Sequence, residues 1–197
     1  MLKNARFGLV ALAMVALPGC AVKDGWQGAA AEKAYDKDLD ARRLAEELNN
    51  DDYWEIYKDG RIYVLTDLKG YQTWLKTDEI PLVVTKIAAG PGGETLKLGL
   101  IKDEAKLMES KVGAKGAAQK MFEGELKGLE KGFYGEVQKN GTVYVFADWN
   151  ELVAFKRNGA ASGETQNGAG PNGANVTFVG KAASAETKAK FANVYKK

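Results

Sequence analysis

The chain has 197 residues, with 28 Lys and Arg against 26 Asp and Glu, a formal net charge of +2, and 45% hydrophobic residues. This near balance argues against a nucleic-acid partner, which requires a strongly basic surface. The absence of histidine removes Ser–His and Cys–His nucleophilic systems and the usual imidazole metal sites. A single cysteine excludes an internal disulfide. We therefore expect no nucleic acid, no metal and no cofactor.

The first 19 residues have the pattern of a secretory signal. Lys3 and Arg6 form a short basic start, and residues 7–17 are almost wholly apolar (FGLVALAMVAL). This run is too short to cross a hydrocarbon core as a helix, which takes roughly 20 apolar residues. We therefore expect residues 1–19 to be a signal peptide that directs export.

Residues 17–20 read Leu-Pro-Gly-Cys. They resemble the lipobox of bacterial lipoproteins, in which an aliphatic residue and two mostly small residues precede a cysteine; Pro18 is a less usual occupant of its place. The resemblance implies cleavage after Gly19 and lipidation of Cys20. One acyl chain holds a protein weakly, whereas the two or three expected on a lipobox cysteine hold it durably on a membrane.

The residues after Cys20 bear on location. By resemblance to sorted lipoproteins of Gram-negative bacteria, Ala21 in place of Asp implies delivery to the outer membrane, facing the periplasm. Residues 20–30 then form the lipidated cysteine and a short tether. Cleavage removes Lys3 and Arg6 and leaves 26 basic against 26 acidic side chains, a formal charge of zero.

The remaining chain contains an internal duplication. Residues 53–68 read YWEIYKDGRIYVLTDL and residues 134–149 read YGEVQKNGTVYVFADW, at a constant spacing of 81 residues. Self-similarity at a fixed spacing is typical of tandem units. Seven positions are identical in the two copies: Tyr53, Glu55, Lys58, Gly60, Tyr63, Val64 and Asp67 recur as Tyr134, Glu136, Lys139, Gly141, Tyr144, Val145 and Asp148.

Each copy predicts a β-hairpin followed by a short helix. The dipeptides at residues 59–60 (Asp-Gly) and 140–141 (Asn-Gly) favour a two-residue type I′ turn, which would set Ile56 opposite Tyr63. Both faces of each hairpin carry apolar residues, so both should be covered. Asp67 and Asp148 are expected N-caps of the following helices, and Asp148 with Glu151 has capping-box spacing. The helical stripe of Leu68, Tyr71, Trp74 and Leu75 predicts core packing.

A second hairpin is expected to close the first copy, over residues 82–101. The second copy keeps the last strand (NVTFVG), but its preceding strand reads SGETQNGAG, which lacks large apolar residues. We therefore expect a loop or a weak edge over residues 158–174. Helical spacing also predicts helices over residues 29–49 and 103–131, the latter interrupted at Gly113 and Gly116. A last helix is expected from Ser184 to Tyr195.

The predicted fold class is α+β, with two tandem ββαββ-type antiparallel repeats joined by a helix and an N-terminal helix after the lipid tether. Residues 31–110 should hold the N-terminal helix and the first repeat. Residues 111–132 should form the connecting helix, and residues 133–197 the second repeat and the C-terminal helix.

Few residues point to catalysis. Glu55 and Glu136 recur in both copies, and if the copies pack about a pseudo-two-fold axis the two carboxylates could approach each other as glycosidase pairs do. A mid-strand glutamate facing partly exposed surface or a lysine is the plainer explanation. Asp36, Asp38, Asp40 and Glu47 match calcium-loop positions, but Ala41 stands where that loop needs glycine. We expect no catalytic residue.

Three functions remain open at this point. The first is a lipid-anchored, non-catalytic binding or scaffold module of the cell envelope, with a possible envelope protein partner. The second is a periplasmic binder of a small ligand or cell-wall glycan through Trp54, Trp74 or Trp149. The third and weakest is a carboxylate-based hydrolase. The possible binding surface for these functions comprises Tyr53, Trp54, Glu55, Tyr134 and Glu136.

Overall fold

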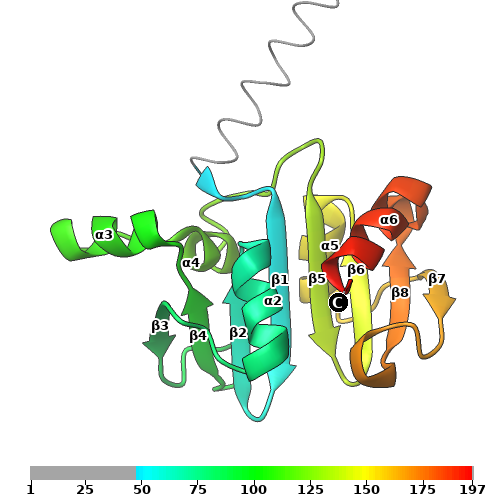
Figure 1. The fold of residues 1–197 in the computed structure, drawn as a ribbon, viewed down its shortest axis with the longest axis horizontal. Coiled ribbons are helices and arrows are strands. Elements are labelled where there is room, and N and C mark those ends of the chain that lie inside the picture. Colours follow the sequence, from blue (N-terminus) through cyan, green and yellow to red (C-terminus); the bar gives the residue numbers. More distant parts are fainter. Residues whose placement is uncertain (1–47, 197) are drawn as a thin grey trace, which may run out of the picture. The chain divides into compact units, whose positions relative to one another are not determined.

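The computed structural model describes residues 48–196, in which eight strands form one mixed sheet (Figure 1). The strand order across the sheet is β3-β4-β2-β1-β5-β6-β8-β7. The strands are β1 (Asp52–Lys58), β2 (Arg61–Leu65), β3 (Val83–Lys86), β4 (Thr95–Gly99), β5 (Tyr134–Lys139), β6 (Thr142–Phe146), β7 (Gly163–Gln166) and β8 (Asn175–Val179). The prediction of a fold that combines helices with a sheet is therefore confirmed.

Five α-helices accompany the sheet in the described part of the chain. They are α2 (Leu68–Thr77), α3 (Lys102–Ser110), α4 (Ala117–Phe122), α5 (Trp149–Asn158) and α6 (Ala185–Val194). Two 3₁₀ turns, η1 (Pro171–Gly173) and η2 (Gly180–Ala183), flank β8. We refer to residues 52–122 as the first half and to residues 134–194 as the second half.

The two central hairpins form as their turn dipeptides predict. Asp59 and Gly60 have φ of 51° and 68°, and Asn140 and Gly141 have φ of 53° and 74°. Positive φ at both central positions matches the twist of the flanking strands. The resulting register pairs Ile56 with Tyr63, as expected from a two-residue loop. Asp67 and Asp148 cap α2 and α5 through their side chains, which confirms both expected helix starts.

Not all strand pairs are antiparallel, so that part of the prediction is wrong. β1 pairs with β5, β2 with β4, and β6 with β8 in parallel. In each half a helix follows the hairpin, and the chain returns as an edge strand before its last strand inserts next to the hairpin. Local turn signals fix the hairpins but carry no information about these longer connections.

Both faces of the sheet are covered by helices, as the apolar residues on both hairpin faces predict. The α2/α6 face buries Trp54, Ile56, Tyr63 and Leu65 against Tyr71 and Trp74 of α2 and Phe191 of α6. The α4/α5 face buries Tyr53, Ile62 and Val64 against Met121 of α4 and Leu152 of α5. Figure 1 shows α2 and α6 in front of the sheet and α5 behind it. Each half thus places its two packed helices on opposite faces.

The connections differ from the predicted helices. The connecting helix expected over residues 111–132 is wrong for most of its length, because only Ala117–Phe122 is helical there. Gly113, with a φ of 79°, lies in the break between α3 and α4, at one of the two expected interruptions. The N-terminal helix predicted over residues 29–49 lies almost wholly outside the described residues. The C-terminal helix is confirmed, with Ser184 as its N-cap and Tyr195 as its C-cap.

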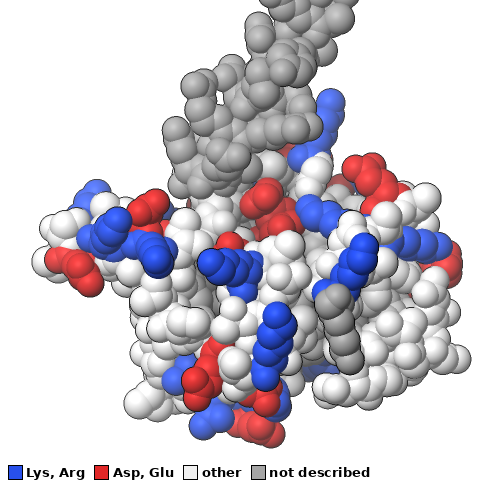
Figure 2. Space-filling model, viewed as in Figure 1, with Lys and Arg blue, Asp and Glu red and all other residues white. Residues whose placement is uncertain are grey.

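The two edges of the sheet differ in character. β7 is the expected weak edge, with all four residues exposed and Lys188 of α6 paired to Glu164 at 2.7 Å. On the α2/α6 side, basic and acidic side chains are interspersed over the left and upper parts of the view, whereas its lower right part shows none (Figure 2). Within residues 48–196, no helix has the length and apolar character needed to cross a membrane.

Candidate functional site

The five residues predicted as a possible binding surface are buried, so this prediction is corrected. Tyr53, Trp54, Glu55 and Glu136 are 0% exposed and Tyr134 is 1% exposed. Aromatic side chains occur on both faces of the hairpins, and helices cover both faces. These side chains are therefore buried. Trp74 and Trp149, the other candidate glycan-stacking residues, are 5% and 7% exposed and pack in the two cores.

Glu55 lies on the α4/α5 face within a polar cluster. The hydroxyls of Tyr53 and Tyr57 donate to its carboxylate, the latter at 2.7 Å. The ammonium of Lys156, from α5 of the second half, lies 2.6 Å from Glu55 Oε2. Lys156 also lies over the ring of Phe122, 4.3 Å from its centroid. A charged hydrogen-bonded partner is what a fully buried carboxylate requires.

Glu136 lies on the α2/α6 face in a different setting. The hydroxyls of Tyr134 and Tyr195 each donate to its carboxylate at 2.5 Å, and that of Tyr71 at 3.3 Å. No lysine or arginine pairs with it among the described residues. Burial raises the pKa of Glu136, although the hydrogen bonds from Tyr134 and Tyr195 act in the opposite direction.

The two glutamates do not share a site. In the parallel β1–β5 register, Glu55 pairs with Val137 whereas Trp54 pairs with Glu136. Because successive residues of a strand point to opposite faces, the two carboxylates lie on opposite sides of the sheet. A paired-carboxylate arrangement needs both groups around one substrate bond. The geometry therefore offers no support for the hydrolase hypothesis at Glu55 and Glu136.

The raised pKa of Glu136 predicts a specific pH dependence of stability. Between the ordinary value of 4.5 and the raised value, the folded chain holds a proton that the unfolded chain has lost. The stabilisation from protonated Glu136 is thus complete below the ordinary pKa and is lost as the pH rises through the raised value. In Glu136→Gln this titration is absent.

Urea denaturation of both proteins from about pH 4 to about pH 7 checks this prediction. The difference in unfolding free energy between the two should shift in favour of Glu136→Gln as the pH rises. Titration of all other groups is common to both proteins and cancels in the difference. A difference that stays constant, or shifts toward the wild type, would contradict the assignment.

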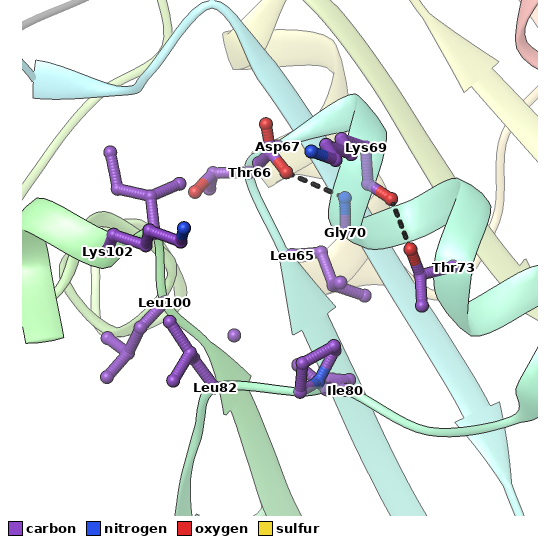
Figure 3. A pocket seen from close by; sticks show the side chains of 13 residues that line it. Leu65, Thr66, Asp67, Lys69, Gly70, Thr73, Ile80, Leu82, Leu100 and Lys102 are labelled. Atoms are coloured by element: carbon purple, nitrogen blue, oxygen red, sulfur yellow. Dashed lines mark hydrogen bonds between the residues drawn. The ribbon is translucent and has the colours of Figure 1, made fainter.

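One open pocket lies at the carboxyl ends of β2 and β4, beside the first turn of α2 (Figure 3). We call it the strand-end pocket. Its volume is about 390 Å³, within the range of small-molecule sites. Its walls are mostly apolar: Leu65, Ile80, Pro81, Leu82, Leu100 and Ile101. Its polar residues are Thr66, Asp67, Lys69, Thr73 and Lys102.

The polar residues of the strand-end pocket are contributed by three segments. Asp67 accepts a hydrogen bond from the backbone N–H of Gly70, which caps α2. Lys69 and Lys102 are exposed at the rim, on α2 and α3 (Figure 3). Thr66 is 4% exposed, and among hydrogen bonds between described residues it only accepts, from Asn49 at 2.8 Å.

Sequence reasoning missed the strand-end pocket. One signal was present, because Gly70 of the first copy stands where the second copy has Glu151. Lys156 and Tyr195 were also missed as partners of the two glutamates, since each comes from a helix distant in sequence. Asp36, Asp38, Asp40 and Glu47, considered for calcium, lie outside the described residues. Residues 48–196 contain no cluster of three or more acidic side chains able to hold a metal ion.

Comparisons with protein-family models, with curated proteins and with solved structures found no match to this chain.

Proposed function

We propose that this protein is a lipid-anchored cell-envelope protein whose described residues form a non-catalytic binding module. The observation that carries the proposal is the contrast between its polar sites. Both buried glutamates have their oxygens engaged by side chains of the chain itself, whereas the strand-end pocket is open and has polar groups at its rim. We assign the binding function to that pocket.

The lipid anchor rests on residues 17–20, which resemble a lipobox and imply acylation of Cys20. Ala21 favours the outer membrane, with the module facing the periplasm. The tether would hold the strand-end pocket within reach of envelope components near one membrane surface, without requiring a membrane-spanning helix.

We further propose that the module arose by tandem duplication of a ββαββ unit. The support is the 81-residue spacing of the two matching hairpin sequences together with the matching order of elements in the two halves. The equivalent hairpin strands β1 and β5 pair side by side. Because of this duplication, each position in the first half can be compared with the equivalent position in the second.

The strand-end pocket favours the small-ligand version of this function over glycan stacking on tryptophan. Its volume and mostly apolar walls suit a small molecule, whereas the three candidate tryptophans are buried. A protein partner that inserts one side chain there would satisfy the same geometry.

In-cell photo-crosslinking tests the proposal. A photoreactive residue is placed at Thr73, which lines the pocket, and in a matched strain at Glu186, which is exposed on α6 away from the pocket. After irradiation of intact cells, mass spectrometry of the membrane fraction should show a discrete added mass at residue 73 only. Equal adducts at both positions, or none at either, would contradict a binding role for the pocket.

A further inference from the structure

The strand-end pocket of the first half has a filled counterpart in the second half. Gly70 and Glu151 are each the third residue of the helix that follows the hairpin, in α2 and α5. Leu100 and Gly180 each follow the last strand of their half, β4 and β8. At this place the first half has the small residue on the helix and the large one after the strand, and the second half has the reverse.

In the second half the side chain of Glu151 occupies the space. A Cβ placed on Gly180 would lie 2.2 Å from Glu151 Oε1, so the carboxylate packs directly on this glycine. Glu151 Oε2 is buried without a hydrogen-bond partner among the described residues. Glu151 does not close the expected capping box, since α5 is capped by Asp148 alone. The carboxylate instead fills the gap between helix and strand.

In the first half this space remains open. Gly70 has no side chain to fill it, although a Cβ placed there would lie 3.2 Å from Asp67 Oδ2 and 3.4 Å from Leu65 Cδ2. Leu100 packs on Gly116, where a Cβ would lie 2.4 Å from Leu100 Cδ2. The open space is part of the strand-end pocket, which both Gly70 and Leu100 line. The second half thus shows that a carboxylate on a short aliphatic stem fits at this place in the fold.

The strand-end pocket has more positive charge around it than the equivalent place in the second half. A carboxylate ligand requires such an excess. The first turn of α5 contains Glu151, whereas the first turn of α2 contains no acidic residue. Asp148 pairs with Lys181 at 2.5 Å. The strand-end pocket instead has two lysines, Lys69 and Lys102, for one carboxylate, Asp67, whose side chain already caps α2. An added carboxylate would balance this excess of positive charge.

We propose that the strand-end pocket binds a small aliphatic carboxylate. Its carboxylate takes the place that the Glu151 carboxylate has in the second half, within reach of the Lys102 ammonium and the Thr66 hydroxyl. Its aliphatic part lies along Leu65, Ile80 and Leu82. This inference names the ligand class for the proposed binding function and rests on that function.

The test uses three probes of the same shape: 4-methylpentanoate, its neutral amide and 4-methylpentylammonium. The full chain is held in phosphatidylcholine nanodiscs, with empty nanodiscs as a blank, and binding is followed by saturation-transfer NMR of the probes. The carboxylate should bind saturably, the amide more weakly and the ammonium not at all. Binding of the amide or ammonium as tight as that of the carboxylate would overturn the proposal, as would no saturable carboxylate signal.

Two variants locate the binding. Gly70→Glu copies the second half and should weaken carboxylate binding by about tenfold or more, because its own side chain fills the space. Lys102→Gln should weaken it roughly threefold, as expected for a partly exposed ion pair. Lys106→Gln, on the same helix but outside the pocket, is the matched control and should bind as the wild type does. Equal behaviour of Lys102→Gln and Lys106→Gln would overturn the assigned place.

The two proposals fail in different ways. Loss of carboxylate binding with persistent adducts at residue 73 in cells would overturn the ligand class and leave the binding function standing. Loss of both would overturn both.

Discussion

Glu136→Ala is expected to lower the free energy of unfolding by about 3–5 kcal/mol. The substitution leaves the hydroxyls of Tyr134 and Tyr195 without the acceptor that each contacts at 2.5 Å. It also opens a cavity, because Glu136 is fully buried on a packed face. Such a loss is a large fraction of the roughly 5–15 kcal/mol that stabilises a typical domain.

Urea denaturation at neutral pH measures this loss, with Glu109→Ala as the control. Glu109 is exposed on α3, so its removal should change the unfolding free energy by no more than about 0.5 kcal/mol. If Glu136→Ala destabilises the chain no more than Glu109→Ala does, the buried hydrogen-bonded carboxylate described here is wrong.

Lys156→Met is expected to lower the free energy of unfolding by about 3 kcal/mol, the lower end of the cost of breaking a buried ion pair. The lysine lies 2.6 Å from Glu55 and its side chain is 22% exposed, whereas Glu55 is fully buried. Removing the cation leaves the Glu55 carboxylate with only hydroxyl donors. Because α5 belongs to the second half and β1 to the first, the pair joins the two halves across their shared face.

A double-mutant cycle separates this pair from ordinary packing losses. Glu55→Gln combined with Lys156→Met should cost less than the sum of the two single changes, with a coupling of about 0.5–3 kcal/mol. Lys188→Met is the matched control, since Lys188 is also a helix lysine paired with a glutamate at 2.7 Å, but at the surface. That change should cost no more than about 1 kcal/mol. Additive single changes at Glu55 and Lys156 would contradict the buried pair.

Local features of the fold were predictable from the sequence. The Asp59–Gly60 turn fixed the register of the first hairpin, and Asp67 marked the start of α2. Apolar residues on both hairpin faces required two covering layers. Each of these inferences depends on residues close together in the chain, where turn geometry and helix capping act directly.

The order of the strands in the sheet and the faces on which the two glutamates lie could not be predicted from residues close together in the chain. The alternation of β1 and β5 places each glutamate on a definite face of its own hairpin, but not on a face of the whole sheet. Whether Glu55 and Glu136 meet depends on how the halves pair. Parallel pairing of β1 with β5 puts them on opposite sides. Lys156 becomes a partner of Glu55 only once α5 covers the first half's strands.

The strand-end pocket could be predicted from the sequence only in part. The exchange of Gly70 for Glu151 is visible when the two copies are aligned, but its meaning depends on the distance between helix and strand. Only the structure shows that Glu151 packs on Gly180 and that Leu100 packs on Gly116. A difference between the two halves can thus be interpreted only once the space around it is known.

Membrane attachment through Cys20 is the central claim, and the Cys20→Ala variant tests it most directly. The full chain and the variant are expressed in cells given an alkyne-tagged fatty acid, and the membrane fraction is analysed for label, chain length and amount. The wild type should carry the label, run at the processed size and sediment with membranes. Cys20→Ala should lose the label, and should either leave the membrane fraction or accumulate as the unprocessed chain. Normal processing with an unchanged membrane fraction in Cys20→Ala would contradict the lipid anchor.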